Sequence, residues 1–367
     1  MTGVDVNVNP LVEYINSLGY SIEKHNGNGT VKTYTSLESE LDSIYNGVGL
    51  RNISHTGIIE LKGADTLDFI HRISTNAVKD LPKEGLTNTV FVTEKGRIID
   101  LATIMNFEGH QLLICSDTYK LKVLSWINKY IITDDVKAND ANGKYTLLEL
   151  IGPQADSIVT LVCGSIVNSI PPDSFKIINT EGMLFFLLKI KEKNGSIKFW
   201  IIADANNAHK FTRYVFENKG PFNLNLVGEE SYNIYRIEQG LLSAPEELND
   251  NYNPLESGLK EYISFTKGCF IGQEVIARLD TYDKVQKNLC GIELEEFPGM
   301  TSGILLYNNE DNEAGIITSV VESTRLRKII GLAYIHKSFL SDETELFCKM
   351  NAGKKIKIKL ASVPFKK

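Results

Sequence analysis

The sequence has few of the residues that build local metal or disulfide motifs. Among its 367 residues are five cysteines, an odd number, and no two of them form a Cys-x-x-Cys pair. This spacing disfavours a disulfide framework, and it disfavours a zinc or iron–sulfur site built from one local motif. It favours a reducing compartment instead. The six histidines are equally scattered.

Long hydrophobic runs and basic charge are also scarce. The longest apolar run, residues 183–188, is far too short to span a bilayer. No basic segment followed by an apolar one opens the sequence, so we expect no secretory signal and a cytoplasmic protein. A net charge of -7 argues against a stable nucleic-acid binder. Only eight of the 39 basic residues are arginines, which draws attention to Arg236 and Arg278.

Helices and turns can be placed from apolar periodicity and capping residues. The predicted helices cover residues 10–18, a segment from a Thr35–Glu38 capping box to Gly47, residues 64–73, residues 117–130 with Leu121, Leu124 and Ile127 on one face, a segment with Pro153 in its first turn that ends near Gly164, residues 207–217, and residues 229–239. A turn is predicted at residues 26–29, where Asn and Gly alternate.

Strands dominate the end of the chain. Strands are predicted at residues 58–61, 90–92, 98–104, 183–191 and 197–203, and then at 291–294, 304–307, 315–321, 329–334, 346–350 and 355–360. The last six are short and separated by turns, which predicts a small antiparallel barrel or sandwich. In the last strand Ile356 and Ile358 alternate with lysines, which indicates a half-buried strand or, alternatively, a basic binding strip.

The most informative motif is Lys267-Gly268-Cys269-Phe270-Ile271-Gly272-Gln273-Glu274. Its glycines let the backbone turn tightly and approach a ligand. A helix that begins near Gly272 directs unpaired backbone N–H groups at the loop. That helix end and Lys267 both favour the thiolate form of Cys269. The alternative is a tight loop that holds a buried, inert cysteine.

This motif resembles the signature of the YgfZ-type folate-binding proteins, which are relatives of the aminomethyltransferase (T-protein) of the glycine cleavage system. Other segments resemble the same superfamily in collinear order: residues 48–57 and 61–63, Ser74-Thr75-Asn76, Glu94-Lys95-Gly96, residues 98–100, 236–240 and 253–259. The resemblance covers residues 40–365. It implies an α+β fold with pseudo-repeated halves: an N-terminal extension at 1–40, a T-protein-like folate-binding body at 41–285 and a C-terminal antiparallel β-barrel at 286–367.

The resemblance also implies a tetrahydrofolate pocket. Its candidate binding residues are Asn76, Arg236, Glu238, Lys267, Gly268, Gln273, Glu274 and Arg278, and Cys269 is the candidate reactive residue. Arg236 suits a carboxylate or the pterin edge, because a guanidinium forms two parallel hydrogen bonds. Alternatively, Arg236 and Glu238 form internal ion pairs, and Gln273 and Glu274 only cap a helix. Phe270 and Tyr282 either stack on a ring or belong to the core.

Two departures separate this sequence from the aminomethyltransferases. Those enzymes usually carry an Asp after the Thr-Asn pair, where this chain has Ala77, and a methyl group cannot act as a proton acceptor. They also carry a Glu that anchors the pterin, where the nearest equivalent here is Lys198. Conversely, they generally lack a cysteine at the position of Cys269.

The resemblance therefore implies a folate-binding protein that supports iron–sulfur protein assembly or repair, with folate and iron–sulfur client proteins as partners. The alternatives are a folate-dependent one-carbon transferase, either an aminomethyltransferase or a demethylase, and a non-enzymatic scaffold whose folate site has decayed. We expect no bound metal, no stable nucleic-acid partner and no membrane attachment.

Overall fold

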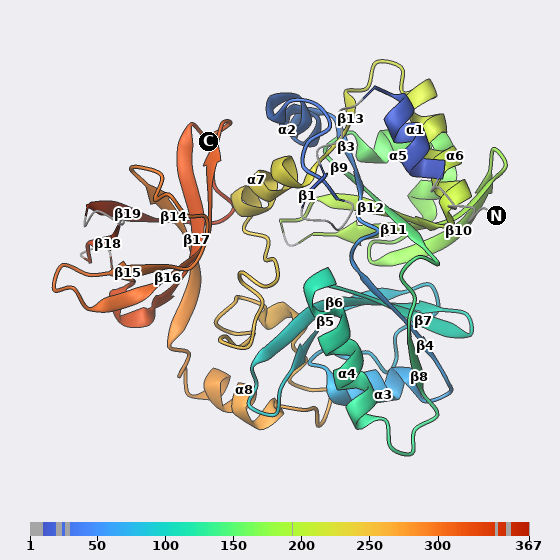
Figure 1. Ribbon diagram of the computed structural model, residues 1–367. Helices are drawn as coiled ribbons and strands as arrows, with labels where there is room; N and C mark the ends of the chain where they lie inside the picture. The colour runs from blue at the N-terminus through green and yellow to red at the C-terminus, as the bar shows by residue number, and fades with distance from the viewer. Residues whose placement is uncertain are drawn as a thin grey trace, which may run out of the picture. The chain divides into compact units, whose positions relative to one another are not determined.

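The computed structural model describes residues 10–19, 24–25, 30–192, 194–341, 344–349 and 354–366 (Figure 1). The turn predicted at 26–29 and the end of the strand predicted at 346–350 lie outside these residues. The chain forms two compact units. Unit 1 comprises Met1–Thr56, Glu84–Leu86 and Ala141–Tyr232, and unit 2 comprises Gly57–Lys83, Thr87–Asp140 and Asn233–Lys367.

Unit 1 is built on a six-stranded sheet with helices packed against it. The strand order is β10 (Ser174–Thr180), β11 (Met183–Lys191), β12 (Ile197–Ala203), β9 (Thr146–Ile151), β3 (Val48–Asn52) and β13 (Leu224–Leu226). Its helices are α1 (Pro10–Ser17), α2 (Leu37–Asn46), α5 (Ala155–Cys163), the 3₁₀ segment η2 (Gly164–Ser169) and α6 (Ala205–Asn218). A two-stranded ribbon joins β1 (Lys24–His25) and β2 (Thr30–Val31).

The core of unit 1 lies between this sheet and helices α5 and α6. Leu50, Leu148, Phe199 and Phe211 are among its fully buried side chains. Fully burying a side chain of this size stabilises the fold by about 1.5–3 kcal/mol. All residues of β9 are buried, so it carries an apolar run rather than the alternation of a half-exposed strand.

The start of α2 differs from the prediction. The N-cap is Ser36 rather than Thr35, and its hydroxyl oxygen accepts a hydrogen bond from Ser39 N at 3.2 Å. Glu40 accounts for the shift, because its buried carboxylate accepts from the backbone N–H groups of Tyr34 at 2.6 Å and Thr35 at 2.8 Å. Gly47 ends the helix, as predicted.

Unit 2 contains a five-stranded sheet. The strand order is β5 (Leu86–Val92), β6 (Ile98–Phe107), β7 (His110–Cys115), β4 (Gly57–Lys62) and β8 (Lys137–Asp140). The accompanying helices are α3 (Thr66–Ile73), the 3₁₀ turn η1 (Asp117–Tyr119) and α4 (Lys120–Tyr130). Helices α3 and α4 are drawn beside this sheet in Figure 1.

Two helical predictions are corrected in detail. The face of α4 that is buried carries Val123 and Ile127, whereas Leu121 is 69% exposed. The predicted apolar face was therefore wrong at its first position, Leu121, which points toward solvent. Helix α5 begins at Ala155, so Pro153 precedes it and does not lie in its first turn.

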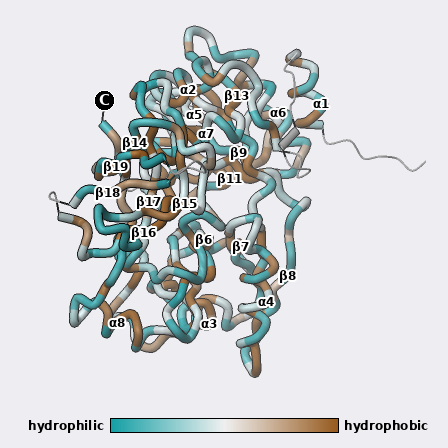
Figure 2. The backbone as a smooth tube through the Cα atoms, turned by 60° about the vertical axis from the view of Figure 1, so that its left-hand side comes forward, coloured by the Kyte–Doolittle hydropathy of each residue, from teal (hydrophilic) through white to brown (hydrophobic). Residues whose placement is uncertain are grey.

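The end of unit 2 is a closed antiparallel barrel. Its strand order is β14 (Lys287–Leu294), β17 (Lys328–His336), β16 (Glu313–Ser323), β15 (Ile304–Tyr307), β18 (Leu346–Lys349) and β19 (Lys355–Ala361), and β14 pairs with β19 to close it. Ile356 and Ile358 point into its core, whereas the lysines that alternate with them are exposed, so the half-buried strand is confirmed. Figure 2 shows the hydrophobic stretch along β17. The α+β fold with a C-terminal barrel is confirmed.

The remaining helical segments lie outside these groups of helices. They are α7 (Glu229–Gln239), the 3₁₀ turns η3 (Lys260–Tyr262) and η4 (Lys337–Phe339), and α8 (Gln273–Thr281). Across the described residues, no helix is both long enough and apolar enough to cross a membrane.

Candidate functional site

The Lys-Gly-Cys motif forms a turn that leads into α8. Gly272 is the N-cap of this helix and has a φ of 79°, and Gly268 has a φ of 96°. Both angles favour glycine over other residues. A Cβ at Gly272 would also lie 2.7 Å from the backbone oxygen of Thr93. The helix predicted to begin near Gly272 is therefore confirmed, and the second glycine is required by space as well as by conformation.

Cys269 has an exposed side chain, which excludes the buried-cysteine alternative. The other cysteines lie in less accessible places. Burial raises the pKa of Cys163 to about 12 and also raises the pKa values of Cys115, Cys290 and Cys348. Cys269 is the one exposed thiol among the described residues. Because reagents must reach a thiol before they can react with it, Cys269 is the accessible one.

Lys267 turns away from solvent and toward the segment that contains Ser74, Thr75 and Asn76. Its Nζ donates to the carbonyl oxygens of His71, Ser74 at 2.6 Å and Asn76 at 2.7 Å. Burial by itself lowers the pKa of Lys267, whereas carbonyl acceptors favour the charged ammonium form. The role of Lys267 in favouring the thiolate of Cys269 stays a prediction.

Asn76 is held by the sheet of unit 2. Its Nδ2 donates to Asn88 O at 2.8 Å and to Thr87 Oγ1 at 3.3 Å, and its Oδ1 accepts from Ala77 N at 2.8 Å. These bonds fix the turn that presents Ala77, whose side chain is exposed. Asn76 therefore shapes this turn, and its contact with folate stays a prediction.

Arg236 and Glu238 lie on α7 and contact strand β16 of the barrel. Arg236 pairs with Glu247 at 3.1 Å and donates to Ser319 Oγ at 2.9 Å. Glu238 is fully buried and pairs with Arg325 at 2.7 Å. These are ion pairs of the kind that the alternative interpretation describes. Their binding to folate stays a prediction.

The candidate residues on α8 differ in exposure. Glu274 and Arg278 are exposed, and their spacing places them on one face of the helix. Gln273 is half-buried at the first position, where its N–H donates to Phe270 O at 3.1 Å. Phe270 belongs to the hydrophobic core, as one of its two interpretations predicted.

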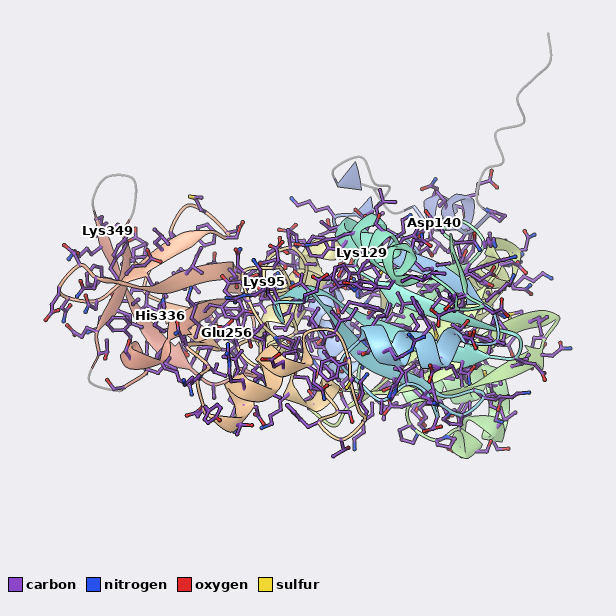
Figure 3. All side chains as sticks on the ribbon, turned by 90° about the horizontal axis from the view of Figure 1, so that it is seen from below. Lys95, Lys129, Asp140, Glu256, His336 and Lys349 are labelled. Atoms are coloured by element: carbon purple, nitrogen blue, oxygen red, sulfur yellow. The ribbon has the colours of Figure 1, made fainter. Side chains whose placement is uncertain are left out.

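Two of the collinear sequence segments contact the motif or the helix that follows it, and a third contacts the barrel. The turn at Gly96 packs against α8, because a Cβ there would lie 3.3 Å from Ile276. Glu256, labelled in Figure 3 together with Lys95, accepts from Asn253 N at 3.0 Å. Its backbone oxygen also accepts from Leu289 N at 2.9 Å, at the start of the barrel. Residues 74–76 and 94–96 thus lie against the motif or α8, and residues 253–259 are joined to the start of the barrel.

Unit 1 contains a buried cluster of charges that includes Lys198. Glu149, only 2% exposed, accepts from Arg51 at 2.5 Å and from Lys198 at 3.0 Å. Trp200 Nε1 donates to the same carboxylate at 3.1 Å. The guanidinium of Arg51 lies 3.2 Å from the centre of the Tyr232 ring. The ammonium at Lys198 is therefore compensated by a carboxylate on the neighbouring strand.

Sequence reasoning missed Arg51 and Glu149 as members of this cluster. A signal was present for Glu149, since it is the only charged residue in the apolar run of β9. A charge inside a buried strand requires a partner. Burial alone would raise the pKa of Glu149, but Lys198 and Arg51 outweigh it and lower the pKa to about 2.

A small polar cavity of about 230 Å³ lies in unit 1 near this cluster. It is lined by Thr30, Val31, Tyr34, Asn52, Ser54, His55, Val227 and Glu229. Glu229 connects the cavity to the cluster, because it lies 3.5 Å from Arg51 and 4.0 Å from His55. The cavity is thus bordered by an ion pair rather than by apolar side chains alone.

Comparison with known proteins decides the family. Residues 12–267 match the model of the GCVT N-terminal domain, and residues 287–367 match the glycine cleavage T-protein C-terminal barrel domain. The chain belongs to the glycine cleavage T-protein family. Members of the T-protein family are folate-dependent.

Individual relatives agree with this assignment. An Arabidopsis thaliana protein described as a chloroplastic transferase is 28% identical over 347 residues, which cover 90% of this chain and 74% of the relative. The aminomethyltransferase of Bacillus licheniformis is 25% identical and covers 91% of each chain. The crystal structure of glycine cleavage system aminomethyltransferase T from Bartonella henselae superposes with a TM-score of 0.83 at 19% identity, covering 97% of each chain. This last likeness shows the T-protein fold.

Proposed function

We propose that this chain is a tetrahydrofolate-binding protein of the YgfZ type that supports iron–sulfur protein assembly or repair in the cytoplasm, with Cys269 at the folate pocket. The observation that carries the proposal is the exposed thiol of Cys269 on a motif loop that is bonded to the segment ending at Ala77. The aminomethyltransferases usually place their carboxylate at that position. The five free cysteines support a reducing compartment.

The residues present suit a folate, although not all of the candidate binding residues are assigned to contact it. Tetrahydrofolate carries an anionic glutamate tail and a pterin edge with N–H donors. The guanidinium of Arg278 and the carboxylate of Glu274 are exposed on one face of α8 and suit these two groups. Arg236 and Glu238 are engaged by Glu247 and Arg325, so we assign them to the support of the site.

The second candidate function is folate-dependent one-carbon transfer, which the names of the bacterial relatives favour. Ala77 weighs against it, because no side-chain carboxylate stands after the Thr-Asn pair. The scaffold alternative rested on Lys198 as a chance replacement. Pairing of Lys198 with Glu149 makes the replacement part of an organised cluster, which weakens that argument.

The test of the iron–sulfur role is complementation. Cells that lack this chain are expected to lose iron–sulfur enzyme activity and to recover it when the wild-type chain is supplied. Cys269→Ser is expected to fail, because a hydroxyl is a far weaker nucleophile than a thiolate at neutral pH. Cys163→Ser, which replaces a half-buried thiol in unit 1, serves as the control and should restore activity. Full recovery with Cys269→Ser would remove the thiol from the proposal.

A further inference from the structure

The ammonium group of Lys267 is saturated by backbone oxygens. A lysine ammonium has three donors, and the carbonyl groups of His71, Ser74 and Asn76 supply three acceptors. These carbonyls lie more than 190 positions before Lys267 in the sequence. With all its hydrogens shared in this way, Lys267 joins two distant segments and has no donor left for a ligand.

The side chain of His71 in turn bonds to the backbone of Lys267. Its Nδ1 accepts from the backbone N–H groups of Val78 at 3.1 Å and Lys79 at 3.2 Å. The proton of the neutral ring therefore resides on Nε2, which donates to the carbonyl of Lys267 at 3.0 Å. Lys267 and His71 thus bond to each other's backbone oxygens.

Further hydrogen bonds continue the junction on both sides of the motif. Ser264 N donates to Thr75 O at 3.0 Å, and Thr75 Oγ1 donates to Tyr262 O at 2.7 Å. On the other side of Cys269, Ile271 N donates to Arg72 O at 3.2 Å. Residues 262–271 therefore run along residues 71–76. Cys269 lies between two anchored residues, two positions from each of them.

The short span that carries the thiol is open. A Cβ added to Gly268 would meet nothing within 4 Å, and Cys269 itself is exposed. Since neighbouring Cα atoms are about 3.8 Å apart, a residue two positions from each anchor has little freedom to move. The backbone is fixed on both sides while the thiol remains accessible. This is an arrangement suited to presenting a side chain.

We infer that Lys267 is the positioning residue of the motif: its ammonium group holds residues 71–76 and the motif loop together, and so fixes Cys269 with respect to the segment that leads into Ala77. Lys267 then acts through backbone geometry and does not touch the ligand. The two departures from the aminomethyltransferases, the missing carboxylate at Ala77 and the added thiol at Cys269, become parts of one hydrogen-bonded structure. The consequence for ligand binding rests on the folate function proposed above.

The test is hydrogen exchange on the full chain, followed for the amides of Ser264 and Ile271. In Lys267→Met, which keeps an unbranched side chain of nearly the same length and loses the donors, their exchange is expected to be at least about tenfold faster. Lys260→Met is the matched control, because Lys260 is exposed and pairs with Asp280 at 2.6 Å. Lys267→Arg keeps charge and donors and is the milder variant if the methionine variant does not fold.

Chemical rescue separates positioning from general destabilisation. Lys267→Ala leaves room for a free alkylammonium ion, so propylammonium chloride is expected to restore slow exchange, whereas sodium chloride and 1-propanol are not. Exchange that stays at the wild-type rate in the folded variants, or that rises evenly along the chain, would overturn the inference. So would a rescue that 1-propanol matches.

Tetrahydrofolate affinity is measured on the same proteins. A wild-type chain that does not bind tetrahydrofolate would remove the proposed function, while the exchange result would still decide the role of Lys267. If wild type binds and Lys267→Met shows faster exchange, the dissociation constant of Lys267→Met for tetrahydrofolate is expected to be about tenfold higher or more. This loss of affinity is on the scale of one charge-assisted contact. An unchanged dissociation constant would refute the functional part of the inference.

Discussion

Glu149→Gln is expected to lower the free energy of unfolding of unit 1 by about 3–5 kcal/mol, the cost of breaking a buried ion pair by removing one partner. The carboxylate of Glu149 is the acceptor shared by Arg51 and Lys198, which are largely buried. A neutral amide removes the nearest carboxylate from both cations, which keep only the longer pairs of Arg51 with Glu229 at 3.5 Å and of Lys198 with Glu192 at 3.6 Å. It also places an NH₂ group against one of the cations. Denaturant titration followed by the signal of unit 1 measures the loss.

The control for this substitution is Glu217→Gln on the surface of α6. Glu217 pairs with Arg213 at 2.7 Å, but both side chains are more than half exposed. Such pairs contribute about 0–1 kcal/mol. Adding Lys198→Met to Glu149→Gln is expected to recover part of the lost stability, because it removes one of the two cations that no longer face a carboxylate at position 149. A loss below about 1 kcal/mol for Glu149→Gln would contradict the buried cluster.

The stability that Glu149 contributes is expected to depend on pH. The pKa of its carboxylate is about 2 in the folded chain against an ordinary value of 4.5. In the pH range between these values the unfolded chain binds more protons than the folded one, so stability falls as pH falls. The contribution of Glu149 is fully present above about pH 4.5 and decreases by about 3 kcal/mol as the pH reaches about 2. The difference in stability between wild type and Glu149→Gln should therefore shrink across this acid range.

Aminomethyl transfer to tetrahydrofolate is expected to be about 10²–10⁴-fold slower with this chain than with the Bacillus licheniformis aminomethyltransferase assayed beside it. This factor is the usual contribution of a positioned acid–base group. The turn that Asn76 fixes presents only the methyl group of Ala77 at this position. Single-turnover assays with an aminomethyl donor measure the rate.

Ala77→Asp is the variant that isolates this cause. The side chain at position 77 is exposed, so a carboxylate there meets no buried surface. The variant is expected to transfer at least about tenfold faster than wild type. Its rate should stay below that of the Bacillus licheniformis enzyme, because the region of Lys198 also differs. A wild-type rate within tenfold of the Bacillus licheniformis enzyme would favour the one-carbon transferase instead.

The barrel was predictable from the sequence because its strands are half-buried. Alternation of apolar and polar residues, as at Ile356 and Ile358, records which face points inward. The central strands β3 and β9 of unit 1 have little alternation to record, because nearly all of their residues are buried. The start of α2 was ambiguous for another reason. Thr35 and Ser36 are both good caps, and the buried carboxylate of Glu40, within the helix itself, decided between them.

The site was predictable in its motif and not in its contacts. Gly272 and the start of α8 follow from the strong conformational preference of glycine, and Cys269 was identified by its place in the motif. The partners of Lys267 are backbone carbonyls, which every residue has, so no sequence signal could have identified them. Glu247, the partner of Arg236, lies on an irregular loop, where periodicity gives no guide to which side chains meet.

Calorimetric titration with tetrahydrofolate tests the central claim, that this T-protein relative binds folate at the motif and at α8. We expect the wild-type chain to bind at micromolar concentrations. Arg278→Ala is expected to bind about tenfold more weakly, the effect of losing one charged hydrogen bond. Arg213→Ala, which removes an exposed arginine from α6, should bind as wild type does. Absence of binding up to high micromolar tetrahydrofolate would contradict the account.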